Sequence, residues 1–195
     1  MRALSILPLL AIAVAAQAAP QPKPQSLGKM GGTMPSTMTV TPLASADGTV
    51  LGSVRLLQEA DGTRVVATVR GLPPGDYAIH IHAVGSCVAP DFASAGGHFN
   101  PEHKMHGMNN PAGSHQGDLP NITVVAASTP GGTSEGSIDA VRKGLRLRDG
   151  DAPLFDADGA AVVIHAKADD YVTDPTGNAG PRLLCGVVAP PQVAK

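Results

Sequence analysis

The stretch that decides the fold and the chemistry of this chain is residues 77–118, YAIHIHAVGSCVAPDFASAGGHFNPEHKMHGMNNPAGSHQGD. It holds six of the seven histidines in a chain of 195 residues, and this concentration indicates a built site. His80 and His82 alternate with Ile79 and Ile81. Because side chains alternate across a strand, both imidazoles leave one face and both isoleucines leave the other. Two nitrogens on one face can bind a single metal ion.

A second set of candidate ligands follows this strand on a segment rich in Gly, Pro and Asn. It contains His98, His106, His115 and Asp118, which are spaced as on a long loop that can fold around an ion. Three imidazoles and one carboxylate form a closed tetrahedral zinc set. A lone histidine is ordinarily a solvated or core residue, but six histidines grouped in this way argue against that alternative. His103 is the extra member, which we interpret as solvated or as a weak alternative ligand.

The composition of the whole chain favours short strands and turns over helices. Gly (23) and Pro (18) are frequent, aromatic residues make up 3% and Trp is absent. The length fits one domain, since a domain typically takes ~100–200 residues. Eight β-branched or alternating runs, each bounded by turn residues, predict an all-β antiparallel sandwich or flattened barrel. The runs are Met38–Leu43, Val50–Gln58, Thr63–Arg70, Asp76–Ala83, Asn121–Ala127, Ser137–Leu145, Ala160–Ala166 and Leu183–Val188.

Four segments give the chain a resemblance to a known family. They are GLPPGDYAIHIH (71–82), SAGGHFNPEHKMHG (94–107), GDLPNI (117–122) and NAGPRLLCGVV (178–188). In order and spacing they resemble the copper/zinc superoxide dismutase family, in its bacterial secreted branch, over about residues 38–189. The resemblance implies that residues 38–195 form an eight-stranded Greek-key barrel, with two long loops that hold a copper ion and a zinc ion outside it.

The resemblance also assigns the ligands residue by residue. Copper would be held by His80, His82, His98 and His165, and zinc by His98, His106, His115 and Asp118. His98 would bridge both ions. His165 lies in the strand run 160–166, where alternation points it away from the apolar face, but only the resemblance makes it a ligand rather than a surface histidine. Four imidazoles suit both oxidation states of copper.

The implied reaction is the conversion of superoxide to dioxygen and hydrogen peroxide by redox cycling of copper, with zinc structuring the site. His98 would take up and release a proton, and Arg182 would hold the anion beside copper. Asp169 matches a carboxylate that joins a copper histidine to a zinc histidine, although by itself it would be interpreted as a turn residue. Thr176 matches a threonine that narrows the channel. Lys167 is interpreted as a solvated lysine, with added positive potential as the alternative.

The chain has two cysteines, Cys87 and Cys185. In an exported chain an even pair predicts a disulfide, and the alternative is two buried free thiols. The resemblance implies the same bridge. It would tie the ligand-bearing loop to the last strand.

The N-terminus predicts export. The first twenty residues, MRALSILPLLAIAVAAQAAP, combine one cation at Arg2, a short apolar run and a small-residue cleavage signal. Residues 1–18 are therefore predicted to be a secretory signal peptide that is cleaved near Ala18. The protein would be periplasmic or secreted, without a stable membrane anchor after cleavage. The alternative is an uncleaved anchor, but the apolar run is short for a membrane span.

Residues 19–37 predict a flexible arm, because they are rich in Pro, Gly and polar residues and show no apolar period. Met30, Met34 and Met38 are spaced by four in and next to this arm. Thioethers can bind Cu(I), but a chance spacing in a disordered arm is the favoured interpretation.

Charge and ligand completeness separate the remaining functional classes. A formal net charge of −2 argues against a nucleic-acid surface. The resemblance implies superoxide as the substrate, and a homodimer is possible. The main rival to the enzyme is a metal carrier or a catalytically silent relative on the same fold. Such relatives characteristically lack copper ligands or the active-site arginine, whereas this chain has all of them. A purely structural β-domain would leave the ligand spacing unexplained.

Overall fold

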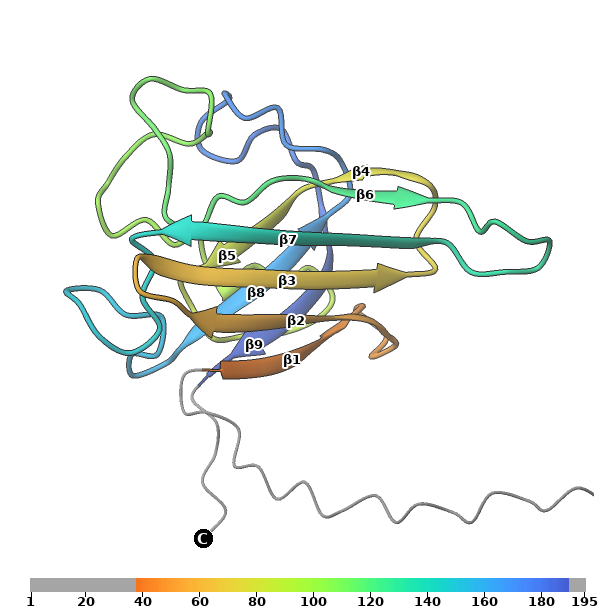
Figure 1. The fold of residues 1–195 in the computed structure, drawn as a ribbon, viewed down its shortest axis with the longest axis horizontal. Coiled ribbons are helices and arrows are strands. Elements are labelled where there is room, and N and C mark those ends of the chain that lie inside the picture. Colours follow the sequence, from red (N-terminus) through yellow and green to blue (C-terminus); the bar gives the residue numbers. More distant parts are fainter. Residues whose placement is uncertain (1–37, 190–195) are drawn as a thin grey trace, which may run out of the picture. The chain divides into compact units, whose positions relative to one another are not determined.

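A computed structural model describes residues 38–189 (Figure 1). In this part of the chain nine strands form one antiparallel sheet that nearly closes into a barrel, as the sequence predicts. The strands are β1 (Met38–Ala44), β2 (Val50–Gln58), β3 (Gly62–Arg70), β4 (Gly75–Tyr77), β5 (Ile79–His82), β6 (Ile122–Val125), β7 (Glu135–Lys143), β8 (Ala160–His165) and β9 (Arg182–Val188). A short 3-10 helix, η1, covers Ala93–Ala95. The predicted signal peptide (1–18) and arm (19–37), with Met30 and Met34, lie outside the described residues.

One predicted strand, residues 76–83, is two strands in the structure. β4 pairs with β6, β5 pairs with β8, and the chain changes partner at Ala78. The backbone N–H of Ala78 donates to the carbonyl oxygen of Lys167 at 2.8 Å, and its carbonyl accepts from the N–H of His165 at 2.9 Å. The sheet order is β4-β6-β7-β3-β2-β1-β9-β8-β5, so its two ends are consecutive in sequence and meet at Ala78. This is how the barrel closes.

The barrel core explains where the histidines point. Ile79 pairs with Ile164 and Ile81 with Val162 across β5 and β8, and all four side chains are fully buried in the main core. The alternate residues of β5, His80 and His82, therefore face outward. They are also buried, so other parts of the chain must cover this outer face.

Two long connections supply that cover. The ligand loop (residues 83–121) joins β5 to β6, and the channel loop (residues 166–181) joins β8 to β9. In Figure 1 these green and blue segments lie at the same end of the barrel. The backbone N–H of Asn109 donates to the carbonyl oxygen of Tyr171 at 3.0 Å, so the two loops are in direct contact.

Within residues 38–189 no helix has the length and apolar character needed to cross a membrane.

Candidate metal centre

The first group of nitrogens comes from β5 and β8. Nδ1 of His82 lies 2.9 Å from the carbonyl oxygen of Gly96, and Nδ1 of His165 lies 3.2 Å from that of Gly180. A carbonyl oxygen only accepts, so Nδ1 carries the proton in both rings and Nε2 is a bare acceptor. The two Nε2 atoms lie 3.4 Å apart. Both bare nitrogens can therefore reach one metal ion.

In His80 the free nitrogen is Nδ1 instead of Nε2, because Asp169 contacts Nε2. Nε2 of His80 lies 2.8 Å from Oδ2 of Asp169, which leaves Nδ1 as the free nitrogen. The other oxygen of Asp169 lies 2.9 Å from Nε2 of His106. One buried carboxylate thus selects the free nitrogen of a ring on each side of the centre. Carboxylates that hold ligand histidines in this way fix the ring orientation and raise its basicity.

His98 stands between the two sides. It lies on the ligand loop, where an isolated β-bridge to His82 holds its backbone, and its ring centroid is 4.0 Å from that of His80. Nδ1 of His98 lies 3.0 Å from Oδ1 of Asp118. Its Nε2 is buried and has no hydrogen-bond partner among residues 38–189. One ring therefore presents a nitrogen to each of two adjacent groups.

The second group consists of Nδ1 of His98, His106 and His115 with Oδ1 of Asp118. Oδ1 lies 3.0 Å, 3.1 Å and 3.3 Å from these three nitrogens in that order. A tetrahedron with bonds of ~2.0 Å separates its ligand atoms by roughly 3.3 Å. Oδ2 of Asp118 accepts from the backbone N–H of Gly107 and of His115, which leaves Oδ1 for the ion. The donor types and their spacing fit zinc.

The first group fits copper. It contains four histidines whose ligand atoms all lie within 4.8 Å of one another: His80, His82, His98 and His165. Imidazole nitrogens suit copper, and two of the four, Nδ1 of His80 and Nε2 of His98, are buried without a partner among the described residues. Buried polar atoms are rarely left unpaired, and a bound ion would satisfy both.

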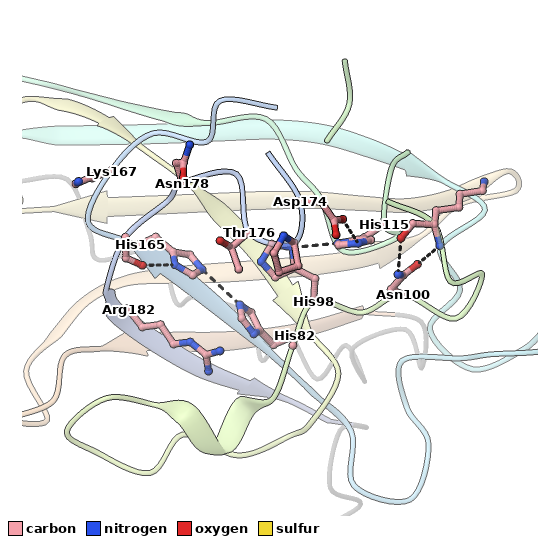
Figure 2. Close-up of a pocket in the computed structure, with 14 residues that line it drawn as sticks. His82, His98, Asn100, His115, His165, Lys167, Asp174, Thr176, Asn178 and Arg182 are labelled. Atoms are coloured by element: carbon pink, nitrogen blue, oxygen red, sulfur yellow. Dashed lines mark hydrogen bonds and ion pairs between the residues drawn. The ribbon is translucent and has the colours of Figure 1, made fainter. Parts of the chain in front are cut away.

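A pocket of about 700 Å³ opens onto the first group (Figure 2). Arg182 and Thr176 line it together with His82. The guanidinium of Arg182 donates to the carbonyl oxygens of Phe92 at 2.5 Å and Gly96 at 2.6 Å. The carbonyl of Gly96 also accepts the Nδ1 proton of His82, so one backbone group positions both the arginine and a ligand ring.

The sequence matches the family model described as copper/zinc superoxide dismutase (SODC) over residues 50–188. The chain belongs to this family. Membership confirms the predicted fold family and enzyme class, and together with the two histidine clusters it confirms copper and zinc as the cofactors.

Several relatives are similar over most of the chain. Superoxide dismutase-like protein YojM of Bacillus subtilis (strain 168) is 40% identical over 148 residues, which are 75% of this chain and 73% of that protein. Copper/zinc superoxide dismutase 2 of Aquifex aeolicus (strain VF5) is 40% identical over 150 residues, 75% of this chain and 83% of the relative.

Solved structures agree with the fold. The crystal structure of a SOD-like protein from Bacillus subtilis has a TM-score of 0.69 at 38% identity and covers 76% of this chain and 96% of that one. The Cu/Zn superoxide dismutase from Brucella abortus has a TM-score of 0.59 at 24% identity, covering 77% of this chain and 99% of that one. At that identity the second likeness concerns the fold alone.

Burial keeps the rings of the first group neutral. It lowers the pKa of His80 to about 4, that of His82 to about 2 and that of His165 to about 3. A neutral imidazole is the form that binds a metal ion.

Around His106 the second group favours positive charge instead. Burial lowers the pKa of His106, but hydrogen bonds with Asp118 and Asp169 outweigh burial and raise the pKa to about 9. The same contacts hold the pKa of both carboxyls well below its usual value, against the opposing effect of burial. A position where two ionised carboxylates converge is suited to a cation.

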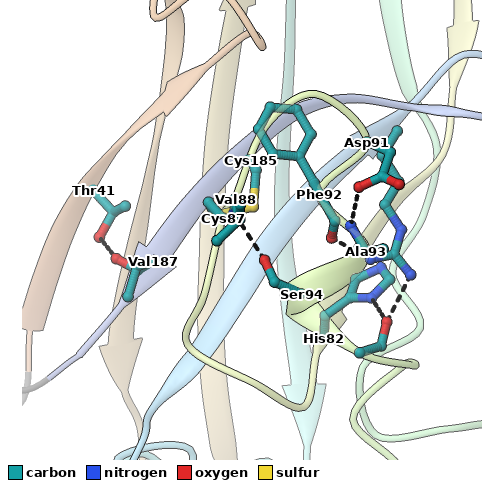
Figure 3. The surroundings of a disulfide bond; sticks show 12 residues. Thr41, His82, Cys87, Val88, Asp91, Phe92, Ala93, Ser94, Cys185 and Val187 are labelled. Carbon is teal, nitrogen blue, oxygen red and sulfur yellow. Dashed lines mark hydrogen bonds between the residues drawn. A yellow bond between two sulfur atoms is a disulfide. The ribbon is translucent and has the colours of Figure 1, made fainter.

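The predicted disulfide joins Cys87 to Cys185, with a Cα–Cα distance of 5.8 Å (Figure 3). Cys185 lies on β9 opposite Val163 of β8, and Cys87 lies on the ligand loop. Phe92, Ala95 and the two cysteines pack on the outer face of β8 in a small apolar cluster. The bridge therefore anchors the segment whose carbonyls hold Arg182.

Two other residues named from the sequence lie on the surface. His103 is exposed on the ligand loop and belongs to neither metal group. Lys167 is also exposed, yet it lines the pocket, so its charge lies at the channel.

Two residues that the sequence did not single out contact the zinc side. Arg142 of β7 donates to the carbonyl oxygen of His115 at 2.6 Å and to Oγ of Ser114 at 2.7 Å. Asp174 of the channel loop accepts from the backbone N–H of His106 at 2.5 Å. These partners are 27, 28 and 68 residues apart, and no local spacing in the sequence marks them.

Proposed function

We propose that the protein is a secreted superoxide dismutase whose two histidine clusters hold copper and zinc side by side. The copper ligands are His80, His82, His98 and His165, and the zinc ligands are His98, His106, His115 and Asp118. The observation that carries this assignment is the ring of His98, which offers Nε2 to one four-residue group and Nδ1 to the other.

Bound copper supplies the one-electron chemistry that converts superoxide to dioxygen and hydrogen peroxide, while zinc supplies charge without redox activity. The chain itself supplies a proton carrier. His98 lines the pocket, and its Nε2 has no partner among the described residues, whereas Nδ1 faces Asp118. Nε2 is therefore the atom that can hold a proton and release it toward a reduced product.

Arg182 supplies the anion site. Two hydrogen bonds to backbone carbonyls fix its guanidinium, and its remaining N–H groups are available to a small anion at the pocket. Thr176 lines the same pocket and limits what can approach. The overall formal charge is −2, so capture of superoxide depends on this local cation.

The proposed location is outside the cytoplasm, with a mature chain that starts after Ala18 and keeps residues 19–37 as an arm before the catalytic domain. The disulfide supports this, because such bonds persist in oxidising compartments. The intact mass of the exported protein tests it: loss of residues 1–18 and of two hydrogens is expected. An unprocessed mass would contradict the cleavage site.

Two substitutions test the metal assignment. His165→Ala removes a ligand that only copper uses, so dismutation should be abolished even at full zinc loading. Asp118→Ala removes a ligand that only zinc uses, so zinc should be bound more weakly while part of the copper redox activity remains. Metal content and the decay of pulse-generated superoxide are measured on the same samples. Near wild-type activity of His165→Ala at full metal loading would show that the copper assignment is wrong.

A further inference from the structure

Asp174 is the only carboxylate among the residues that line the pocket. Three cations line the same pocket, namely Lys104, Lys167 and Arg182. A negative charge at this position opposes the capture of an anionic substrate. Its presence there calls for another role that outweighs this disadvantage.

The contacts of Asp174 indicate what that role is. Its Oδ1 accepts a hydrogen bond of 2.5 Å from the backbone N–H of His106 and lies 3.9 Å from Nε2 of His115. As a proposed zinc ligand, Nδ1 of His115 carries no proton, so the proton of this ring belongs on Nε2, the nitrogen that faces Asp174. One carboxylate oxygen thus approaches two of the zinc ligands from the channel side, and Figure 2 shows Asp174 beside His115.

Asp169 does not fill this role for His115. Its two oxygens lie against the rings of His80 and His106. The backbone of His115 is held by Arg142 from the barrel side, but that contact is to a carbonyl oxygen and does not orient the ring. Asp174 is the charged group that faces the outer nitrogen of the ring at 3.9 Å, a separation that one small movement or a bridging water closes.

We propose that Asp174 is a positioning residue of the zinc side. Its carboxylate ties the channel loop to the ligand loop through the N–H of His106, and it orients the ring of His115. This contribution to zinc binding offsets its unfavourable effect on anion capture. The inference rests on the zinc assignment made under the proposed function. Its test therefore uses zinc affinity, which is measured without reference to dismutation.

Zinc affinity is measured by competition with a chromophoric chelator on the full chain. Asp174→Ala should weaken zinc binding by roughly 10- to 100-fold, the range found for groups that hold metal-binding histidines. Asp174→Asn keeps an oxygen that accepts from His106, so its loss should be smaller. Glu135→Gln removes one negative charge from an exposed ion pair with Arg70 and should leave zinc affinity unchanged.

The geometry is followed by placing Co²⁺ in the zinc site. The visible spectrum of Asp174→Ala should differ from that of wild type, and the spectrum of Asp174→Asn should lie closer to wild type. Unchanged zinc affinity and an unchanged spectrum in Asp174→Ala would overturn the inference. Asp118→Ala separates the two levels of the proposal. If Asp118→Ala also binds zinc normally, the zinc assignment itself fails, whereas a loss in Asp118→Ala alone refutes only the role of Asp174.

Charge gives an independent readout. At matched metal content and low salt, Asp174→Asn should react with superoxide faster than wild type, because a repulsive charge is gone from the pocket. The two rates should converge in 1 M salt, where the screening length is ~3 Å. A rate for Asp174→Asn equal to or below that of wild type at low salt would contradict the claim that the charge of Asp174 slows the capture of superoxide.

Discussion

At the scale of single residues, the outer nitrogen of each ligand histidine is as important as the inner one. Asp169 occupies the outer nitrogens of His80 and His106, and backbone carbonyls occupy those of His82 and His165. Each ring therefore has one bare nitrogen in a known direction. These outer contacts orient the rings toward the two ligand groups.

Gly177 shows how closely Asp169 is packed. A Cβ at Gly177 would lie 1.9 Å from Oδ1 of Asp169 and 2.6 Å from Nε2 of His106, and φ is +65°. Gly177→Ala should therefore displace the carboxylate and weaken zinc binding by roughly 10- to 100-fold. Chelator competition measures this. Gly131→Ala is the matched control, since φ is +77° there but nothing lies within 4 Å, and equal zinc affinity of the two variants would contradict the packing argument.

The proposed role of Arg182 in anion capture makes a kinetic prediction. Arg182→Ile should leave both metals bound, because the guanidinium contacts carbonyls rather than ligand nitrogens. It should lower the second-order rate by roughly one to two decades, and its salt dependence should be flatter than that of wild type. Superoxide decay across a salt series at matched copper content measures both effects. Equal rates and equal salt slopes in the two proteins would rule out the role given to Arg182.

The protonation of the ligand rings predicts how the metal-stripped protein responds to acid. The folded pKa values of His80, His82 and His165, about 4, 2 and 3, lie below the unfolded value of ~6.5. Each neutral ring therefore contributes stability that is complete above pH ~6.5 and is lost as the pH falls toward the folded pKa. His106 acts in the opposite sense, because its pKa is raised to about 9, so its contribution is lost as the pH rises through that value.

We therefore expect the urea midpoint of chelator-treated protein to fall from pH 7 to pH 4, since three rings act together on the acid side. His165→Gln should flatten this dependence because one of the three titrating rings is removed. A midpoint that does not change between pH 7 and pH 4 would contradict the buried neutral state of these rings.

At the scale of elements, the features that depend on local sequence patterns were predicted, whereas those that depend on contacts between distant residues were not. The alternation of Ile and His in β5 predicted the outward face, and the clustered turn residues predicted the long loops. The break at Ala78 was missed because alternation continues through residues 76–83, while the change of partner from β6 to β8 depends on residues far away in the sequence. His165 needed the family resemblance for the same reason.

Arg142 belongs to the contacts that no pattern reveals. From β7 it donates to Oγ of Ser114 and to the carbonyl oxygens of His115 and Gln116, so the barrel wall grips the zinc side of the ligand loop. Arg142→Met should destabilise the zinc-loaded protein by about 1.5–3 kcal/mol, the value of a hydrogen bond to a charged group, and by more if the carbonyls stay unpaired.

Urea unfolding measures that loss, and hydrogen exchange of amides 114–118 locates it. Arg64→Met is the matched control: Arg64 pairs with Asp139 on the exposed surface, where an ion pair contributes little to stability. If the two variants lose equal stability, the hydrogen bonds from Arg142 to the ligand loop contribute no more than an exposed ion pair does.

At the scale of the whole molecule, three side-chain links are among the contacts that join the loops to the closed barrel. Asp169 joins the channel loop to β5, Arg142 joins β7 to the ligand loop, and the disulfide joins the ligand loop to β9. The barrel is a rigid support, and the links hold the loop residues of the metal centre in place against it. Of these links, only the disulfide could be predicted from residue type alone.

Under the role proposed for Arg182, the disulfide couples global stability to anion capture. Cys87 and Cys185 are 98 residues apart, and closing a loop of that length contributes up to ~4.7 kcal/mol in the chain-entropy model. Cys87 also holds the segment that carries the carbonyls of Phe92 and Gly96, which fix Arg182. The small apolar cluster on β8 is the other support of this segment, and it buries few side chains.

Replacing both cysteines by serine should therefore have two effects. The free energy of unfolding should fall by about 2–5 kcal/mol, and the superoxide rate at matched copper content should fall because Arg182 loses its fixed orientation. Urea unfolding and superoxide decay measure them on one preparation. Adding a reductant to wild type should reproduce both losses, whereas the serine variant should not respond to it. A lower stability with an unchanged rate would show that the apolar cluster alone is enough to position Arg182.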